Sequence, residues 1–183
     1  MMLYRTARRK LRLFRAKYVA SRAAGALATD RRADYDVVFV LGKRFQGWIL
    51  EAICGEIGRR LDGRYCVHHS CTNLPKAKAY WFSHYALTPE CIRNNPYIWN
   101  SRRVVFFTHP SDEWGITDEE LMYSLNQCDR VVVMCTEFRR LLESKGLRAG
   151  KSAVLVGGAD PNVFAGHERG GGVVGLCSAF YPR

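Results

Sequence analysis

The polar residues best placed to do chemistry follow an apolar run in the middle of the chain. Residues 104–107 predict a buried strand, and Thr108, His109, Ser111 and Asp112 come after it. In a parallel sheet, the carboxyl ends of strands are the positions from which such folds normally act. A histidine there can hydrogen-bond a sugar hydroxyl or, when protonated, a phosphate. We take His109 as the candidate catalytic residue and the other three as substrate-binding candidates, with a packing role for His109 as the alternative.

Two further predicted strands contribute candidates in the same way. Residues 36–41 predict a central strand, and Gly42, Lys43 and Gly47 lie in the turn that follows it. Doubly wound folds bind phosphate or sugar at such a turn, because the amides of the next helix point outward there. The turn lacks the Gly-Lys-Ser/Thr ending of a P-loop, and a plain tight turn is the alternative. His84 ends the third predicted strand and is a further substrate-binding candidate.

Four cysteines and histidines near the second predicted strand do not have the spacing of a metal site. Cys66, His68, His69 and Cys71 lie where alternate residues face opposite sides of a strand, and no second ligand pair follows. We therefore expect no bound metal. The chain has seven cysteines, an odd number placed mostly in apolar segments, which favours reduced and buried thiols in a cytoplasmic protein.

The elements that must position the candidates alternate between strand and helix. Apolar runs predict strands over residues 36–41, 64–69, 79–84, 104–107, 129–134 and 153–156. Helices are predicted over 117–128, which opens with a Thr117–Glu120 capping box, and over 136–146, which ends at a glycine. A helix over 48–61 is expected to pack through Ile49, Ile53, Ile57 and Leu61. The alternation predicts an α/β fold, a Rossmann-like parallel sheet flanked by helices.

The formal net charge of +11 is concentrated at the N-terminus. Residues 1–25 hold eight Arg or Lys and no acid, which leaves the rest of the chain at +3. An apolar stripe at helical spacing (Leu3, Ala7, Leu11, Phe14, Tyr18) accompanies the charge, so we predict a basic amphipathic helix on an anionic membrane surface. The candidate membrane-binding residues are Arg5, Arg8, Arg9, Lys10, Arg12 and Arg15. A solvated tail and, less favoured, a nucleic-acid-binding arm are the alternatives.

Targeting and spanning signals are not found in this sequence. It has no run of 18 uninterrupted apolar residues, and no apolar core follows the basic start. We predict a cytoplasmic protein, peripheral on the inner membrane face. Residues 23–33 are predicted as a linker, which makes residues 1–34 a basic segment that precedes the domain.

Two stretches near the end of the sequence carry a family resemblance. Residues 131–147 read Val-Val-Val-Met-Cys-Thr-Glu-Phe-x-x-x-Leu-x-x-x-Gly-Leu, and residues 158–164 read Gly-Ala-Asp-x-x-x-Phe. In this order they resemble the segment before, and the motif between, the two Rossmann-like domains of family-4 glycosyltransferases, whose architecture is called GT-B. Gly158, Asp160 and Phe164 would be the interdomain motif.

The resemblance implies the N-terminal half of a retaining GT-B glycosyltransferase. Residues 35–165 would be the acceptor-side domain, and residues 166–183 a linker and the first strand, 173–178, of a second domain. Such enzymes take a nucleotide sugar as co-substrate, need no other cofactor, and hold the diphosphate with cations of the second domain. The acceptor would be a glycan or a lipid-linked molecule, and a histidine often occupies the position that corresponds to His109.

The resemblance also implies that this chain alone is inactive. A continuation of the chain or a second subunit would have to supply the second domain. The rival interpretation is a non-catalytic Rossmann-like module that docks to a membrane or a partner protein through its basic N-terminus.

Overall fold

The computed structural model describes residues 2–27, 32–109 and 115–155, and within the first helix the side chains from Arg9 onward. The described residues form one six-stranded parallel sheet with the order β2-β1-β3-β4-β5-β6. The strands are β1 Tyr35–Val40, β2 Tyr65–His68, β3 Ala77–Phe82, β4 Arg102–Phe107, β5 Arg130–Val133 and β6 Ser152–Val154. The predicted α/β Rossmann-like sheet is confirmed. Ser111, Asp112, Gly158, Asp160, Phe164 and the predicted strand 173–178 lie outside the described residues.

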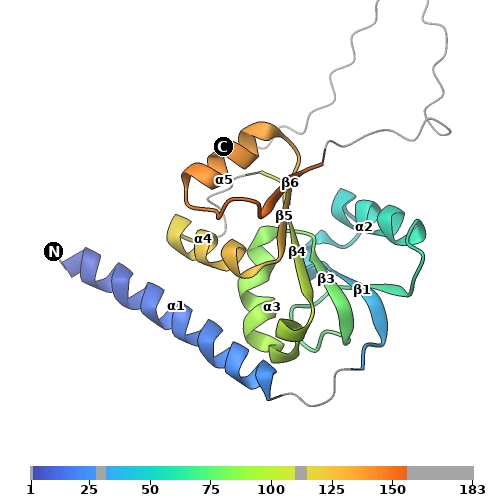
Figure 1. Cartoon of the computed structure of the whole chain (residues 1–183), viewed down its shortest axis with the longest axis horizontal. Helices are drawn as coiled ribbons and strands as arrows, with labels where there is room; N and C mark the ends of the chain where they lie inside the picture. Colours follow the sequence, from blue (N-terminus) through green and yellow to red (C-terminus); the bar gives the residue numbers. More distant parts are fainter. Residues whose placement is uncertain (1, 28–31, 110–114, 156–183) are drawn as a thin grey trace, which may run out of the picture.

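Helices lie on both sides of the sheet, but unequally. They are α1 Met2–Ala26, α2 Ile49–Arg59, α3 Thr88–Asn94, α4 Asp118–Gln127 and α5 Thr136–Ser144, with 3-10 turns η1 Lys43–Phe45, η2 Tyr85–Leu87 and η3 Pro96–Asn100. In Figure 1, α2 lies on one side of the sheet and α1, α3 and α4 lie on the other. Helix α5 packs on that second side, because the ring of Phe138 contacts Phe107 at a centroid distance of 5.9 Å.

The apolar runs become strands because side chains on both faces of each central strand are buried. Val38, Val40, Tyr80 and Phe82 are fully buried on the side that carries α1 and α3. Continuous apolar sequence is what such doubly covered strands require, and alternation would leave polar groups in the core. The register places Val38 beside Tyr80 and Val40 beside Phe82, so the core is continuous from strand to strand.

Two local signals for helix ends are confirmed. The Thr117 hydroxyl accepts a hydrogen bond from the backbone N–H of Glu120, whose carboxylate accepts one from the N–H of Thr117. Gly146 follows α5 with φ of +105°, a conformation that a residue with a Cβ rarely adopts.

The apolar stripe of α1 packs against the domain. Tyr18 is 1% exposed, and its hydroxyl lies 2.6 Å from that of Ser124. Its ring meets Tyr123 edge to face at 5.3 Å, and the neighbouring ring of Phe14 joins the same cluster. The helix predicted here is confirmed, but Phe14 and Tyr18 face the protein. They were expected to face a membrane; in the structure they pack instead on Tyr123 and Ser124 of the domain.

The C-terminal turns of α1 are held as firmly as its middle. The Ser21 hydroxyl is buried and donates to the carbonyl of Ile92 at 2.6 Å. A Cβ on Gly25 would lie 2.2 Å from the Pro96 carbonyl oxygen, so only glycine allows this close approach. The predicted linker over residues 23–33 is therefore wrong at its start, because the helix continues to Ala26 and docks there.

Helix α2 is rotated relative to the prediction. It buries Leu50, Cys54 and Gly58, and it leaves Ile49 66% exposed. The rotation follows from Gly58, where a Cβ would come within 2.4 Å of the Tyr65 ring. The predicted packing stripe (Ile49, Ile53, Ile57, Leu61) is thus partly open to solvent, since Leu61 is also 39% exposed.

Candidate functional site

The strand order reverses beside β1, and this reversal marks one place in the sheet. From β1 the chain crosses to β2 on one side and then returns to β3 on the other side. The loops that leave the carboxyl ends of β1 and β3 therefore diverge and leave a crevice between them. In open α/β sheets ligands bind in such a crevice.

A cavity of about 480 Å³ lies at this crevice. We call it the carboxyl-edge cavity. Its wall combines residues of the β1–α2 segment, the residue that caps η2 after β3, the residues that follow β4, and side chains of the sheet face. The lining residues are Arg44, Phe45, Trp48, Ile49, Leu50, Ile53, His84, Phe106, Thr108, His109 and Met134. Its volume is in the range of small-molecule sites, and apolar and aromatic side chains with a few polar groups are their usual lining.

The cavity is open because α2 covers only part of its side of the sheet. Phe106 lies on that face, where its ring contacts Trp81 at 6.0 Å. Among the described helices α2 alone lies there, against β2, and Met134 beyond it is 43% exposed. Trp48 at the start of α2 is 48% exposed. Exposed large apolar side chains around a crevice are typical of a binding surface.

His84 forms the buried polar end of the cavity. It is 4% exposed, stacks on Tyr85 at 4.3 Å and on Phe45 at 5.3 Å, and its Nδ1 accepts a hydrogen bond from the N–H of Ala86. Burial lowers the pKa of His84 to about 4, and electrostatic repulsion of its charged form by the neighbouring His109 and Arg44 adds to this effect. His84 is therefore neutral at pH 7, with its proton on Nε2 because Nδ1 accepts.

His109 and Thr108 enter the cavity from the end of β4. The His109 ring is exposed and lies 6.4 Å from that of His84. The structure thus brings His109, His84 and the 42–47 turn together, as their positions after parallel strands predicted. The buried Thr108 hydroxyl oxygen has no hydrogen-bond partner among the described residues, and the same holds for Ser83 after β3. A buried polar atom without a partner is costly, and ligand contact is one reason for a protein to keep it.

Gly42, Lys43 and Gly47 are not among the described residues that line the cavity, and their part in substrate binding stays a prediction. Gly47 has φ of +74°, and Gly42 packs where a Cβ would meet Leu87 at 3.1 Å. The two glycines therefore shape the turn. The sequence analysis missed three lining residues of the same turn and helix start, Arg44, Phe45 and Trp48. An aromatic residue in a turn that follows a buried strand could have indicated a binding surface there.

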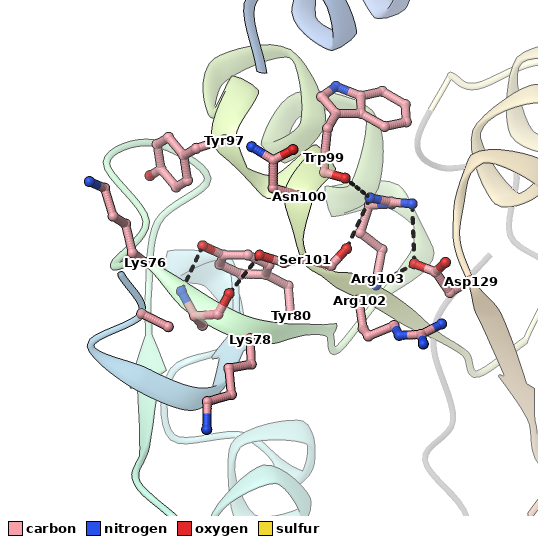
Figure 2. Close-up of a pocket in the computed structure, with 12 residues that line it drawn as sticks. Lys76, Lys78, Tyr80, Tyr97, Trp99, Asn100, Ser101, Arg102, Arg103 and Asp129 are labelled. Carbon is pink, nitrogen blue, oxygen red and sulfur yellow. Dashed lines mark hydrogen bonds and ion pairs between the residues drawn. The ribbon is translucent and has the colours of Figure 1, made fainter. Parts of the chain in front are cut away.

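A second cavity, of about 540 Å³, lies at the opposite edge of the sheet. We call it the amino-edge cavity; Figure 2 shows it at the amino ends of β3 and β4. Four cations line it, Lys76, Lys78, Arg102 and Arg103. Lys78 is paired with Asp36 at 2.6 Å. This cavity is the larger and the more basic of the two.

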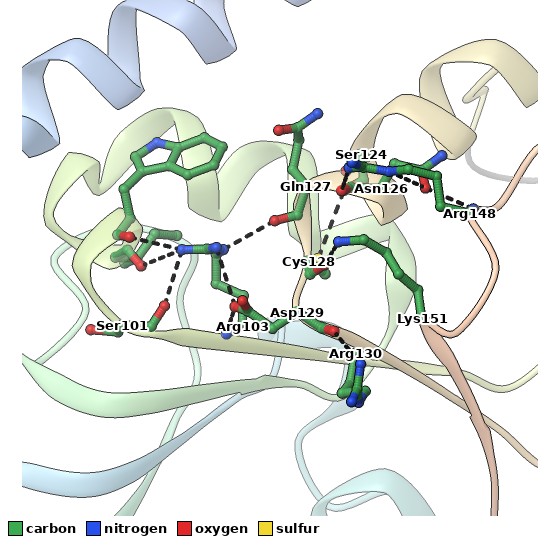
Figure 3. A network of polar contacts seen from close by, with 12 residues as sticks. Ser101, Arg103, Ser124, Asn126, Gln127, Cys128, Asp129, Arg130, Arg148 and Lys151 are labelled. Carbon is green, nitrogen blue, oxygen red and sulfur yellow. Dashed lines mark hydrogen bonds and ion pairs between the residues drawn. The ribbon is translucent and has the colours of Figure 1, made fainter.

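The buried arginine of the amino-edge cavity, Arg103, is engaged in the fold. Figure 3 shows the Arg103 guanidinium among backbone carbonyls; its Nη1 donates to those of Ile98, Trp99 and Ser101 at 3.0–3.2 Å. Nη2 lies 3.2 Å from the carboxylate of Asp129, and Nε donates to a further carbonyl. Arg103 is only 11% exposed. This arginine ties η3 to β4 and to the start of β5.

Residues 2–27, 32–109 and 115–155 contain no group of three or more His, Cys, Asp or Glu that could hold a metal ion. Over the same residues, no helix combines the length and the apolarity that crossing a bilayer requires. The described cysteines are free thiols, and Cys54, Cys71, Cys91 and Cys128 are buried.

Comparison with known proteins does not assign this chain to a family. No family model matches the sequence, and no curated protein matches it. The geometry of the carboxyl-edge cavity therefore carries the functional argument.

Proposed function

We propose that this chain provides the acceptor side of a glycosyl transfer reaction. The observation that carries the proposal is the carboxyl-edge cavity, in which His109, His84 and Thr108 meet at the reversal of the strand order. Binding sites of open α/β sheets lie there. The resemblance of residues 130–164 to family-4 glycosyltransferases adds the reaction class.

The lining of the cavity favours an acceptor over a nucleotide sugar. Among the described lining residues, seven of eleven are apolar and Arg44 is the single Arg or Lys. The diphosphate of a nucleotide sugar carries two negative charges, which proteins neutralise with several converging cations or helix N-termini. An alcohol with an apolar portion fits better, such as a lipid-linked glycan whose sugar hydroxyl reaches the histidines.

The two histidines would take different parts in this reaction. A neutral His109 imidazole can accept a hydrogen bond from the attacking hydroxyl, which increases the electron density on its oxygen. His84, neutral at pH 7 and with Nδ1 engaged, can only donate through Nε2. It would orient a sugar oxygen, and Thr108 would contribute its unpaired hydroxyl.

The donor would bind elsewhere. We propose that the nucleotide sugar is held by a second domain, from a continuation of the chain or a second subunit, whose cations stabilise the leaving diphosphate. By itself, the part of the chain that the structure describes would then bind the donor only weakly. The rival function, a non-catalytic module, rests on the basic helix α1 and predicts that the cavity binds no acceptor at all.

Calorimetric titration tests the proposal. An octyl glucoside, below its micelle concentration, serves as the acceptor analogue, and uridine and guanosine diphosphate sugars serve as donors. We expect the acceptor analogue to bind more tightly than either donor, and His109→Ala to weaken it about tenfold, the value of one hydrogen bond. His68→Ala, in β2 and outside the cavity, is the matched control and should bind as the parent protein does.

Two results would overturn the assignment. Micromolar binding of a diphosphate sugar would make this the donor side. Equal acceptor binding by His109→Ala and the parent protein would remove His109 from the site.

A further inference from the structure

Helix α1 has a second apolar face, which points away from the domain. Its members recur at intervals of three and four residues, and all of them are exposed: Leu13, Ala16, Ala20, Ala23 and Ala24, with Leu27 directly after the helix end at Ala26. Leu13 is 56% exposed and Leu27 is 82% exposed. At about 100° per residue these positions form one stripe, roughly opposite to Phe14, Tyr18 and Gly25. We call it the outer stripe.

Basic side chains border the outer stripe on both sides. Lys10 and Lys17 lie roughly 60–80° around the helix on one side, and Arg12 lies roughly 80° around on the other. Arg9 lies in line with the stripe at its N-terminal end. No acidic residue occurs before Asp30, so no carboxylate of the helix itself neutralises these cations.

Two other arginines of the described part of α1 have a different task. Arg15 lies over the ring of Tyr123 at 5.2 Å, and Arg22 lies over that of Trp99 at 5.9 Å. Both therefore border the seam between α1 and the domain. Among the side chains that the structure describes, from Arg9 onward, the cations available to an external partner are Arg9, Lys10, Arg12 and Lys17.

We infer that the outer stripe and its four cations are a docking surface for an anionic lipid bilayer. An interfacial helix places an apolar stripe at the boundary between headgroups and acyl chains, while lysine and arginine beside it reach the phosphates. The small alanines would let the helix lie close to the surface. The inference does not rest on the proposed function, because α1 and α2, which flanks the cavity, lie on opposite sides of the sheet.

Charge and apolarity together select this partner. A second copy of α1 packed on the stripe would bring cations against cations, with no acidic residue on either helix to compensate. A nucleic acid would pair with the cations but would leave the leucines and alanines in water. A bilayer with anionic headgroups satisfies both features.

Co-sedimentation of the full chain with lipid vesicles tests the inference. The vesicles are of phosphatidylcholine alone or of an equimolar mixture with phosphatidylserine. We expect binding to the anionic vesicles only. A variant with Arg9, Lys10, Arg12 and Lys17 changed to Gln should bind several hundredfold more weakly, at about fivefold for each cation.

The stripe is tested separately from the charge. Leu13→Glu with Ala20→Glu should weaken binding to anionic vesicles at least about tenfold. Gln46→Glu with Leu61→Glu changes the net charge equally at exposed positions around α2 and should change binding less than about twofold, because distant charges are screened. Both changes to α1 are at exposed positions, and circular dichroism verifies that the helix is retained.

Three results would overturn the inference. The first is equal binding of the stripe variant and its charge-matched control. The second is a dimer in sedimentation velocity that the stripe variant abolishes, which would make the stripe a contact between copies. The third is binding of a single-stranded oligonucleotide that depends on the four cations, together with no binding to anionic vesicles.

Discussion

The two edges of the sheet each carry a cavity of similar size but of opposite character. The amino-edge cavity is the larger, at about 540 Å³ against about 480 Å³. It is lined by four cationic side chains, which are the residue types that bind anions. Yet its buried arginine, Arg103, is bonded to four carbonyls and to Asp129 (Figures 2 and 3). The carboxyl-edge cavity has fewer polar groups, but the Thr108 hydroxyl in its wall has no partner among the described residues.

The difference shows that ligand binding is better indicated by whether the polar groups of a cavity already have hydrogen-bond partners than by how many such groups line it. A cation whose donors are all engaged stabilises the fold and has nothing to offer a ligand. A buried hydroxyl without a partner has a free energy cost that a ligand can recover. Substitutions at the two edges should therefore act on different quantities, stability at one and binding at the other.

The largest effect is expected at Arg103. Arg103→Met removes the donors to the carbonyls of η3 and leaves the Asp129 carboxylate without its cation. Breaking a buried pair from one side costs about 3–5 kcal/mol of unfolding free energy. Arg102→Met, an exposed neighbour in the same cavity, should change it by less than about 0.5 kcal/mol. Urea denaturation measures the unfolding free energy of both variants. Similar losses for Arg103→Met and Arg102→Met would mean that Arg103 does not hold the amino edge of the sheet together.

The next effect is a dependence of stability on pH at His84. Its folded-state pKa of about 4 lies below the unfolded value, so the unfolded chain binds the proton first as the pH falls. The contribution of His84 to stability is complete above pH 6.5 and is lost between pH 6.5 and pH 4, at a cost of about 3 kcal/mol.

His84→Asn isolates this contribution, because the Asn side chain keeps an acceptor near the position of Nδ1. Urea denaturation at pH 7 and pH 4.5 should show a smaller loss of stability for the variant than for the parent protein. A histidine titration followed by NMR should place the His84 midpoint near 4. A midpoint near 6.5 would show that His84 is solvated and that the cavity is wider than described.

The smallest effect separates stability from binding at one side chain. Thr108→Val removes a buried hydroxyl that has no partner among the described residues, and it should raise the unfolding free energy by about 1 kcal/mol while it weakens binding of the acceptor analogue. Thr117→Val removes the hydroxyl of the α4 capping box and should lower the unfolding free energy by about 1 kcal/mol. Opposite signs support the distinction, and a loss of stability in both variants would contradict it.

The sequence by itself determined the elements and their order. The uninterrupted apolar runs that became the carboxyl-terminal parts of β1, β4 and β5 needed no tertiary information, because consecutive strand residues face opposite sides and here three in a row are buried. The capping box at Thr117 and the glycine after α5 are local signals that act within one turn of helix. The positions of His84 after β3 and of His109 after β4 also followed from apolar runs in the sequence.

Only the tertiary structure decided which face each helix turns to the sheet. Helix α1 has two apolar faces, and the close approaches of Gly25 to Pro96 and of Tyr18 to Ser124 choose the inner one. Helix α2 leaves Ile49 exposed and Ile53 and Ile57 half-buried, because Gly58 admits the ring of Tyr65. The hydrophobic effect has no direction, so a pattern of apolar residues states that a face will be buried without stating against what. Close packing between surfaces distant in the sequence makes that choice, and here it also opened the cavity beside α2.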